Sequence, residues 1–148
     1  MNANVLGFEC SLYNGNIDKI LMFLSGLTYK YYVSNYLLID SKEVLLPKKH
    51  NDFWIKPNTL ESMAKETIWE LVLFVYDKNV IEQPIKTYDD YVNSSCVACL
   101  LFYDCGLLEI YVKEPHLRNR LLELLIKIGA EDLKHITDDC NYRVFLYP

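Results

Sequence analysis

The last third of this chain is a continuous unit of strands and one helix, and it constrains the fold more than any other segment. Residues 97–103 are apolar on both faces, residues 104–106 form a turn, and residues 107–112 return as a second apolar strand. A helix then begins at Glu114-Pro115, because proline suits the first turn of a helix, and Gly129 is placed to end it. Two short strands close the chain. The segment therefore predicts an α+β domain with a C-terminal ββαββ unit.

The first two thirds of the chain predict further elements around the same sheet. Residues 5–11 alternate as a strand, and residues 69–76 are apolar on both faces, as a central strand is. Between them, apolar side chains recur at helical spacing, at Ile17, Ile20, Leu21 and Leu24, with Gly26 as the terminating glycine. We predict one domain over residues 1–148, with a mixed, mostly antiparallel sheet of roughly six to eight strands and helices mainly on one face.

Two kinds of local signal refine this layout. Residues 29–33 and 36–40 resemble two strands joined at Ser34-Asn35, which is the spacing of a hairpin. A Thr or Asn followed three residues later by an acidic residue is typical of a capping box, in which each side chain bonds the other residue's backbone N–H. Such boxes are predicted at Asn58 with Glu61 and at Thr87 with Asp90.

Charge and cysteine usage indicate the compartment and exclude some partners. The net charge is −5, and this argues against nucleic acid as a partner, because phosphate binding needs clustered Lys and Arg. No apolar run reaches the roughly 18 residues of a membrane-spanning helix, and the first residues lack the charged start of a signal peptide. The five cysteines are an odd number, which suggests reduced thiols. We predict a cytoplasmic protein without a membrane partner or a cofactor.

Cys96 and Cys99 have the spacing of a metal or redox pair, but they lie on a predicted strand. Side chains alternate along a strand, so two residues three apart are expected to point to opposite faces. We therefore predict that all five cysteines are free thiols without metal.

The histidines offer a weak case for acid–base chemistry. His135 lies near Asp138 and Asp139, yet aspartates in a turn between strands also serve local hydrogen bonding. His50 and His116 have no recognisable metal-ligand spacing relative to it. The sequence assigns no catalytic residue and no metal site.

Several short motifs between residues 87 and 143 are characteristic in combination. They are Thr87-Tyr88-Asp89-Asp90-Tyr91, Ser95-Cys96, Leu100-Leu101 with Tyr103-Asp104, Glu109-Ile110-Tyr111-Val112-Lys113, Gly129, and residues 136–143, with weaker similarity at Gly7-Phe8-Glu9. On these residues the chain resembles a small bacterial family of unknown function, found mainly in Gram-positive, spore-forming lineages. The resemblance implies a single-domain bacterial cytosolic protein, and it supplies no catalytic residue.

One candidate partner surface lies in the irregular segment 41–57 and the predicted hairpin beside it. Aromatic side chains next to charge are what an interface hot spot needs. The alternative is that the tryptophan only pins a loop to the core. The candidate residues are Tyr31, Tyr32, Tyr36, His50, Phe53 and Trp54.

A second candidate surface is a polar sheet face around Glu109. Alternation along residues 107–112 places Glu109 and Tyr111 together, with Glu9 and Tyr103 expected on the same face. A carboxylate among tyrosines suits a ligand or partner surface, and the alternative is an ordinary solvated face.

Three classes of function remain open. The first is a non-enzymatic protein-interaction module, of immunity or regulatory type, whose partner is another protein or a second copy of this chain. Twelve tyrosines favour it, because tyrosine gives large contact area at low entropic cost. The second is a small-ligand-binding or sensory domain, and the third is an enzyme with an unrecognised carboxylate–histidine site.

Overall fold

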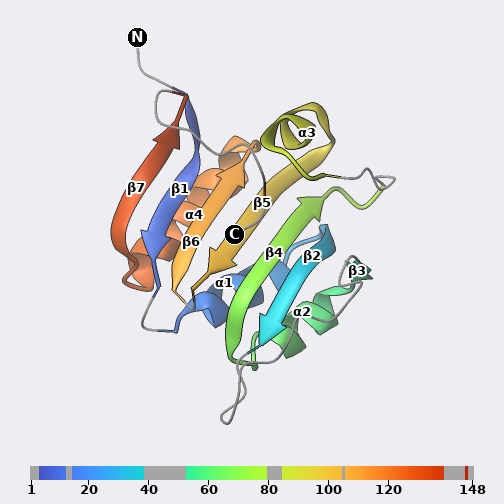
Figure 1. The fold of residues 1–148 in the computed structure, drawn as a ribbon, viewed down its shortest axis with the longest axis vertical. Coiled ribbons are helices and arrows are strands. Elements are labelled where there is room, and N and C mark those ends of the chain that lie inside the picture. Colours follow the sequence, from blue (N-terminus) through green and yellow to red (C-terminus); the bar gives the residue numbers. More distant parts are fainter. Residues whose placement is uncertain are drawn as a thin grey trace.

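A computed structural model describes residues 4–12, 15–38, 53–79, 85–104, 106–138 and 146. These residues form a seven-stranded sheet and four helices (Figure 1). The strands are β1 (Val5–Ser11), β2 (Lys30–Leu38), β3 (Phe53–Ile55), β4 (Ile68–Tyr76), β5 (Cys96–Tyr103), β6 (Leu107–Val112) and β7 (Glu131–Thr137). The helices are α1 (Ile17–Ser25), α2 (Pro57–Met63), α3 (Tyr88–Asn93) and α4 (Pro115–Lys127).

The strand order is β3-β2-β4-β5-β6-β1-β7, and every described pair runs antiparallel. The α+β class and the C-terminal order β5-β6-α4-β7 are confirmed, but the predicted mixed sheet is wrong. A helix between two strands normally makes them parallel neighbours. Here β1 lies between β6 and β7, so each of them pairs antiparallel with β1 instead. The last predicted strand lies outside the described residues, except for Leu146.

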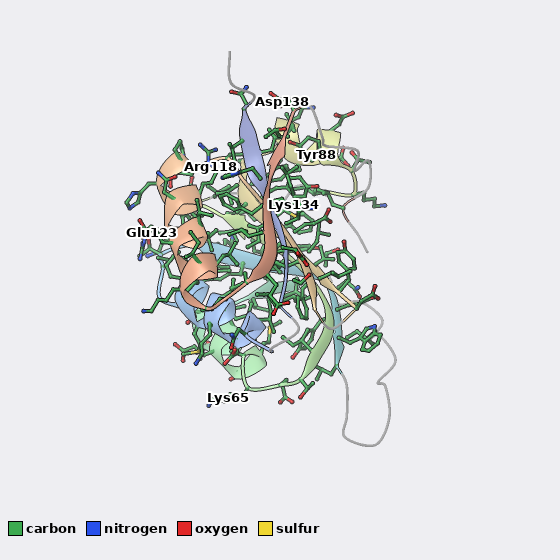
Figure 2. All side chains as sticks on the ribbon, turned by 90° about the vertical axis from the view of Figure 1, so that its left-hand side faces the viewer. Lys65, Tyr88, Arg118, Glu123, Lys134 and Asp138 are labelled. Carbon is green, nitrogen blue, oxygen red and sulfur yellow. The ribbon has the colours of Figure 1, made fainter. Side chains whose placement is uncertain are left out.

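Helices α1, α2 and α4 cover one face of the sheet, here called the helix face, and α3 lies on the other, the α3 face (Figure 2). The helix face holds the larger core, and in α4 it buries Leu117, Leu121 and Leu125. The spacing of Leu121, Leu124, Leu125 and Ile128 predicts one buried stripe; Leu121 and Leu125 are buried as expected, whereas Leu124 and Ile128 are only partly buried. None of the described helices is long and apolar enough to cross a membrane.

The predicted hairpin at Ser34-Asn35 is wrong, because β2 is one continuous strand along β4. Val33 pairs with Leu73 and Asn35 pairs with Val72, so Ser34 is an extra residue, a β-bulge. The bulge shifts the alternation by one residue. As a result Tyr36, like Val33, faces the helices, and the break in pattern resembles a turn in the sequence.

The predicted capping boxes have different outcomes. At α3 the Asp90 backbone N–H donates to Thr87 Oγ1 at 3.0 Å, and the Thr87 N–H donates to the Asp90 carboxylate at 3.1 Å, so this box is confirmed. The box at Asn58 is wrong, because Pro57 begins α2 and Lys56 is its N-cap, so the helix starts two residues earlier than predicted.

Gly7 and Gly129 occupy positions where a side chain would clash or strain the backbone. Gly129 ends α4 at φ +78°, with the Ala130 N–H bonding the Leu125 carbonyl, as in a Schellman motif. A Cβ on Gly7 would lie 1.8 Å from the Ile110 carbonyl oxygen in the neighbouring strand. Gly26, in contrast, has φ −82°, so the expected left-handed terminating glycine is wrong there.

Candidate functional site

The tyrosine and tryptophan residues of the first candidate partner surface, on β2 and β3, lie on opposite faces of the sheet. Tyr31 is fully buried on the helix face, where its hydroxyl donates to the Leu24 carbonyl and burial raises its pKa to about 12. Tyr36 also lies on the helix face, partly buried, and burial raises its pKa to about 12. A buried Tyr31 offers no surface to a partner, so its expected place in an interface is wrong. His50 lies outside the described residues, and Phe53 is described only as the first residue of β3.

Trp54 and Tyr32 lie together on the α3 face. Their ring centroids are 5.1 Å apart in an edge-to-face arrangement, and Trp54 also packs edge-to-face at 5.2 Å on the buried Tyr76. The Lys30 ammonium lies 4.2 Å above the Trp54 ring. These contacts fix β3 to the sheet, as the structural alternative for Trp54 expects, and leave a partner role for Trp54 as a prediction.

A polar pocket of about 200 Å³ surrounds Glu109 on the α3 face. Glu9 and Glu109 are direct cross-strand partners, and Glu9 faces Lys134 on its other side. Tyr103 also lines this pocket, so the expected grouping of Glu9, Tyr103 and Glu109 is confirmed as geometry. Carboxylates that face each other across two strands repel each other. Tyr111 shares the strand face but is buried.

Tyr111 belongs instead to a cluster of three tyrosines beneath α3. The rings of Tyr88, Tyr91 and Tyr111 have centroids between 5.3 and 6.3 Å apart. Lys113 holds this cluster to the sheet, because its ammonium donates to the Tyr91 and Ser94 carbonyls at 2.5 and 2.9 Å and lies 4.5 Å from the Tyr91 ring. Burial lowers the Lys113 pKa from its ordinary value.

A cleft of about 290 Å³ opens between this cluster and the start of α4, and we call it the α3 cleft. Figure 2 shows Tyr88 and Arg118 at the same end of the sheet. Its charged residues are Lys113 and Arg118, and the Arg118 guanidinium donates to the Val5 carbonyl at 3.1 Å. The sequence did not single out these two cations as a pair, since they come from a strand end and a helix. The full lining is Val5, Leu6, Tyr88, Tyr91, Val92, Val112, Lys113 and Arg118.

Cys96 and Cys99 both lie on the α3 face, so the expectation of opposite faces is wrong. The reason is a bulge at Val97: Ala98 pairs with Val75, yet Cys96 pairs with Tyr76. Cys96 is a buried free thiol whose single hydrogen is shared between the Ala98 and Val75 carbonyls, at 3.0 and 3.4 Å from Sγ, and burial raises its pKa to about 12. Cys105 and Cys140 lie outside the described residues, so five free thiols without metal stay a prediction.

The histidine candidates are spread apart. His135 lies on β7 and packs against the Phe8 ring at 5.4 Å, whereas His116 is exposed on α4. Asp138 follows β7 and Asp139 lies outside the described residues. Within the described ranges, no three His, Cys, Asp or Glu side chains are grouped to hold a metal ion.

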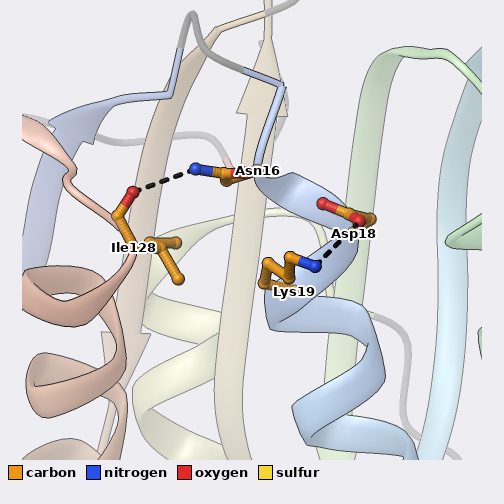
Figure 3. Close-up of polar contacts among 4 residues, drawn as sticks. All are labelled: Asn16, Asp18, Lys19 and Ile128. Carbon is orange, nitrogen blue, oxygen red and sulfur yellow. Dashed lines mark hydrogen bonds and ion pairs between the residues drawn. The ribbon is translucent and has the colours of Figure 1, made fainter.

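A groove of about 830 Å³ separates α1 from α4, and we call it the α1–α4 groove. The Asn16 side-chain amide donates to the Ile128 carbonyl at 2.9 Å and joins the two helices at one end (Figure 3). Sequence reasoning missed this groove, although Met22 was a signal, since it is apolar and lies outside the buried stripe of α1. The groove lining is Asn16, Asp18, Lys19, Met22, Phe23, Leu124, Lys127 and Ile128.

Comparison with known proteins supports the expected family. A family model described as "Protein of unknown function (DUF2691)" matches residues 8–147. "Uncharacterized protein YncE" of Bacillus subtilis (strain 168) is 31% identical over 77 residues, which are 52% of this chain and 49% of that protein. The chain thus spans about half the length of this curated relative. No solved structure matches significantly. The resemblance inferred from the sequence is confirmed, and the chain belongs to the DUF2691 family of unknown function.

Proposed function

We propose that the protein is a non-enzymatic, regulatory interaction module of the bacterial cytosol, which binds an acidic amphipathic helix of another protein in the α1–α4 groove. The observation that carries this proposal is an apolar groove between two helices with basic residues at its margin. A groove of this kind accepts the apolar face of a partner helix, because the side chains of that helix pack between the side chains of the two helices that form the groove.

The floor of the groove is apolar and accessible. Met22 is 48% exposed, and Phe23, Leu124 and Ile128 are partly buried, each with one side in the core. Figure 3 shows the Ile128 side chain pointing from α4 toward α1. Methionine adapts its shape to different apolar partners, which suits a docking surface. Covering these four side chains would remove apolar surface from water.

The margin of the groove is mainly basic, although the chain has a net charge of −5. Lys19 and Lys127 line it, and the Arg120 guanidinium lies 4.8 Å above the Phe23 ring beside it. Within the described part of the chain, Asp18 is the only carboxylate in the lining, and it lies 4.0 Å from the Lys19 ammonium. This charge distribution favours a partner helix whose polar margin carries Glu or Asp.

The test uses a designed peptide of about 18 residues, or about five helical turns, with Leu on one face and Glu on its margins. Fluorescence anisotropy of the labelled peptide should give saturable binding with a Kd of ~1–50 μM at low salt. Met22→Glu should weaken this binding about tenfold or more, because it places a charge in the apolar floor.

Ile126→Glu is the matched control, since Ile126 is 63% exposed on α4 but does not line the groove. It should leave the Kd unchanged. A peptide with Lys in place of Glu should bind more weakly. Equal binding of the two peptides, or an equal loss of binding in both variants, would contradict the proposal.

Sedimentation of the protein alone tests whether a second copy of this chain occupies the groove instead. A dimer that Met22→Glu dissociates would show that it does.

A further inference from the structure

We infer that the α3 cleft is a binding site for a small carboxylate with an apolar or aromatic body, separate from the α1–α4 groove. The two features that carry this inference are a pair of positioned cations and apolar walls around them. Neither depends on the proposed protein partner, because the two sites share no lining residue.

The cleft is locally basic in an acidic chain. Among the residues that the structure describes, Lys113 and Arg118 are its charged lining residues and no carboxylate lines it, while the whole chain has 20 acidic and 15 basic residues. An anion entering the cleft therefore meets two positive charges in its wall, while the nearest carboxylates lie outside the lining, with Glu114 near Arg118 and Asp89 and Asp138 near Tyr88. Arg118 is partly buried, so its charge is screened less than an exposed one, whereas Lys113 is exposed.

Both cations are held in place by backbone carbonyls. The Lys113 ammonium has three donor hydrogens and gives two bonds, to the Tyr91 and Ser94 carbonyls. Arg118 has five donor hydrogens, and Val5 accepts one bond from them. Each cation thus keeps donor capacity for a ligand, and Arg in particular suits two parallel bonds to a carboxylate. Fixed side chains lose less entropy on binding than mobile ones.

The remaining walls fit a small apolar body. Leu6, Val92 and Val112 line the cleft together with the rings of Tyr88 and Tyr91. Val92 is 50% exposed on α3, so its side chain is accessible to a ligand. The volume of about 290 Å³ lies at the lower end for ligand sites, so a compact ligand such as an arylacetate or a branched-chain acid fits better than a nucleotide.

Isothermal titration calorimetry with sodium phenylacetate at low salt tests the inference. The control ligand is 2-phenylethylamine, which has a similar shape but carries a positive charge. Phenylacetate should bind saturably, at ~1 mM Kd or tighter, and the amine should not bind. Arg118→Gln should weaken phenylacetate binding about tenfold, since it removes a charge-assisted pair of bonds. Lys65→Gln is the matched control, because Lys65 is exposed and lines neither the α3 cleft nor the α1–α4 groove, and it should bind as the native chain does.

NMR chemical shifts locate the ligand independently of affinity. Phenylacetate should shift Val92 and Val112 signals and leave Met22 unchanged. The inference is overturned if neither phenylacetate nor isovalerate binds, if the amine binds equally well, or if Arg118→Gln binds as tightly as the native protein while its thermal melt is unchanged. Met22→Glu should not affect phenylacetate binding, so failure of the groove and failure of the cleft are distinguishable.

Discussion

The two faces of the sheet differ in the chemistry of their cores. The helix face is mostly aliphatic, with leucine, isoleucine and valine side chains packed under three helices. The α3 face is built largely from aromatic and sulfur-containing side chains under one six-residue helix, and its core holds Phe74, Tyr76, Tyr91, Cys96, Cys99 and Tyr111. Aliphatic side chains need only close packing, whereas a tyrosine or a cysteine also carries a polar group that requires a partner.

This difference explains where the charged cavities lie. The polar pocket at Glu109 and the α3 cleft both involve residues of the α3 face, where a short helix covers less of the sheet. The helix face instead forms its groove between two helices, away from the strands. The comparison teaches that each face carries its own kind of opening: an apolar groove between two helices on the helix face, and charged cavities on the α3 face.

The largest expected effect is on the helix face. Leu125→Ala should lower the free energy of unfolding by about 2–5 kcal/mol, because it leaves a cavity in a fully buried position. Leu124→Ala is the matched control on the same helix, and it should cost clearly less because Leu124 is only partly buried. Urea melts measure both. Equal losses would remove the distinction between core and groove positions of α4.

A smaller effect is expected where α3 joins the other face. Thr87→Ala should lower the free energy of unfolding by about 1 kcal/mol, measured in urea melts, because the N-cap hydrogen bond is lost.

Backbone hydrogen bonds from Lys86 and Thr87 lower the Asp90 pKa in the folded state. Because the pKa of Asp90 is lower in the folded state, its ionised carboxylate stabilises the fold at pH values above the unfolded pKa of about 3.9. This stabilisation is lost as the pH falls through the pKa of the folded state. Asp90→Asn melts should therefore differ from native ones at pH 7 and converge with them in acid.

The smallest expected effect on the free energy of unfolding concerns Tyr91 in the core of the α3 face. The Tyr91 hydroxyl is buried without a hydrogen-bond partner among the described residues, and burial raises its pKa above the ordinary value. Tyr91→Phe should leave the free energy of unfolding unchanged or raise it by up to ~1 kcal/mol, because an unsatisfied buried polar group is removed. Thermal and urea melts measure this change. A loss of more than about 1 kcal/mol would show that the hydroxyl has a partner in the segments that the structure does not describe.

Sequence reasoning was most successful where a single periodicity runs without interruption. Strand β1 and the capping box of α3 were predicted with their bounds, because alternation and capping are local properties. The break at Ser34 was read as a turn, since an extra residue in a strand and a two-residue loop disturb the pattern in the same way. The α3 cleft could not be predicted, because Lys113 and Arg118 meet only through the packing of α4 beside the sheet.

The same limit applies to the α1–α4 groove. Leu121, Leu124 and Leu125 share one apolar stripe, and helical spacing alone does not say which of them a neighbouring helix covers. Only the placement of α1 leaves Leu124 partly open. The family match was recoverable from the sequence because it rests on the motifs themselves.

The bulges have a consequence for how chain length can vary among relatives. Leu6, Ser34 and Val97 are each an extra residue within a strand. Removing one residue at a bulge restores regular alternation and leaves every later side chain on its present face, whereas a deletion in a regular part of the strand turns the rest of the strand over. We therefore expect single-residue deletions to be tolerated better at these three bulges than in the regular parts of the same strands.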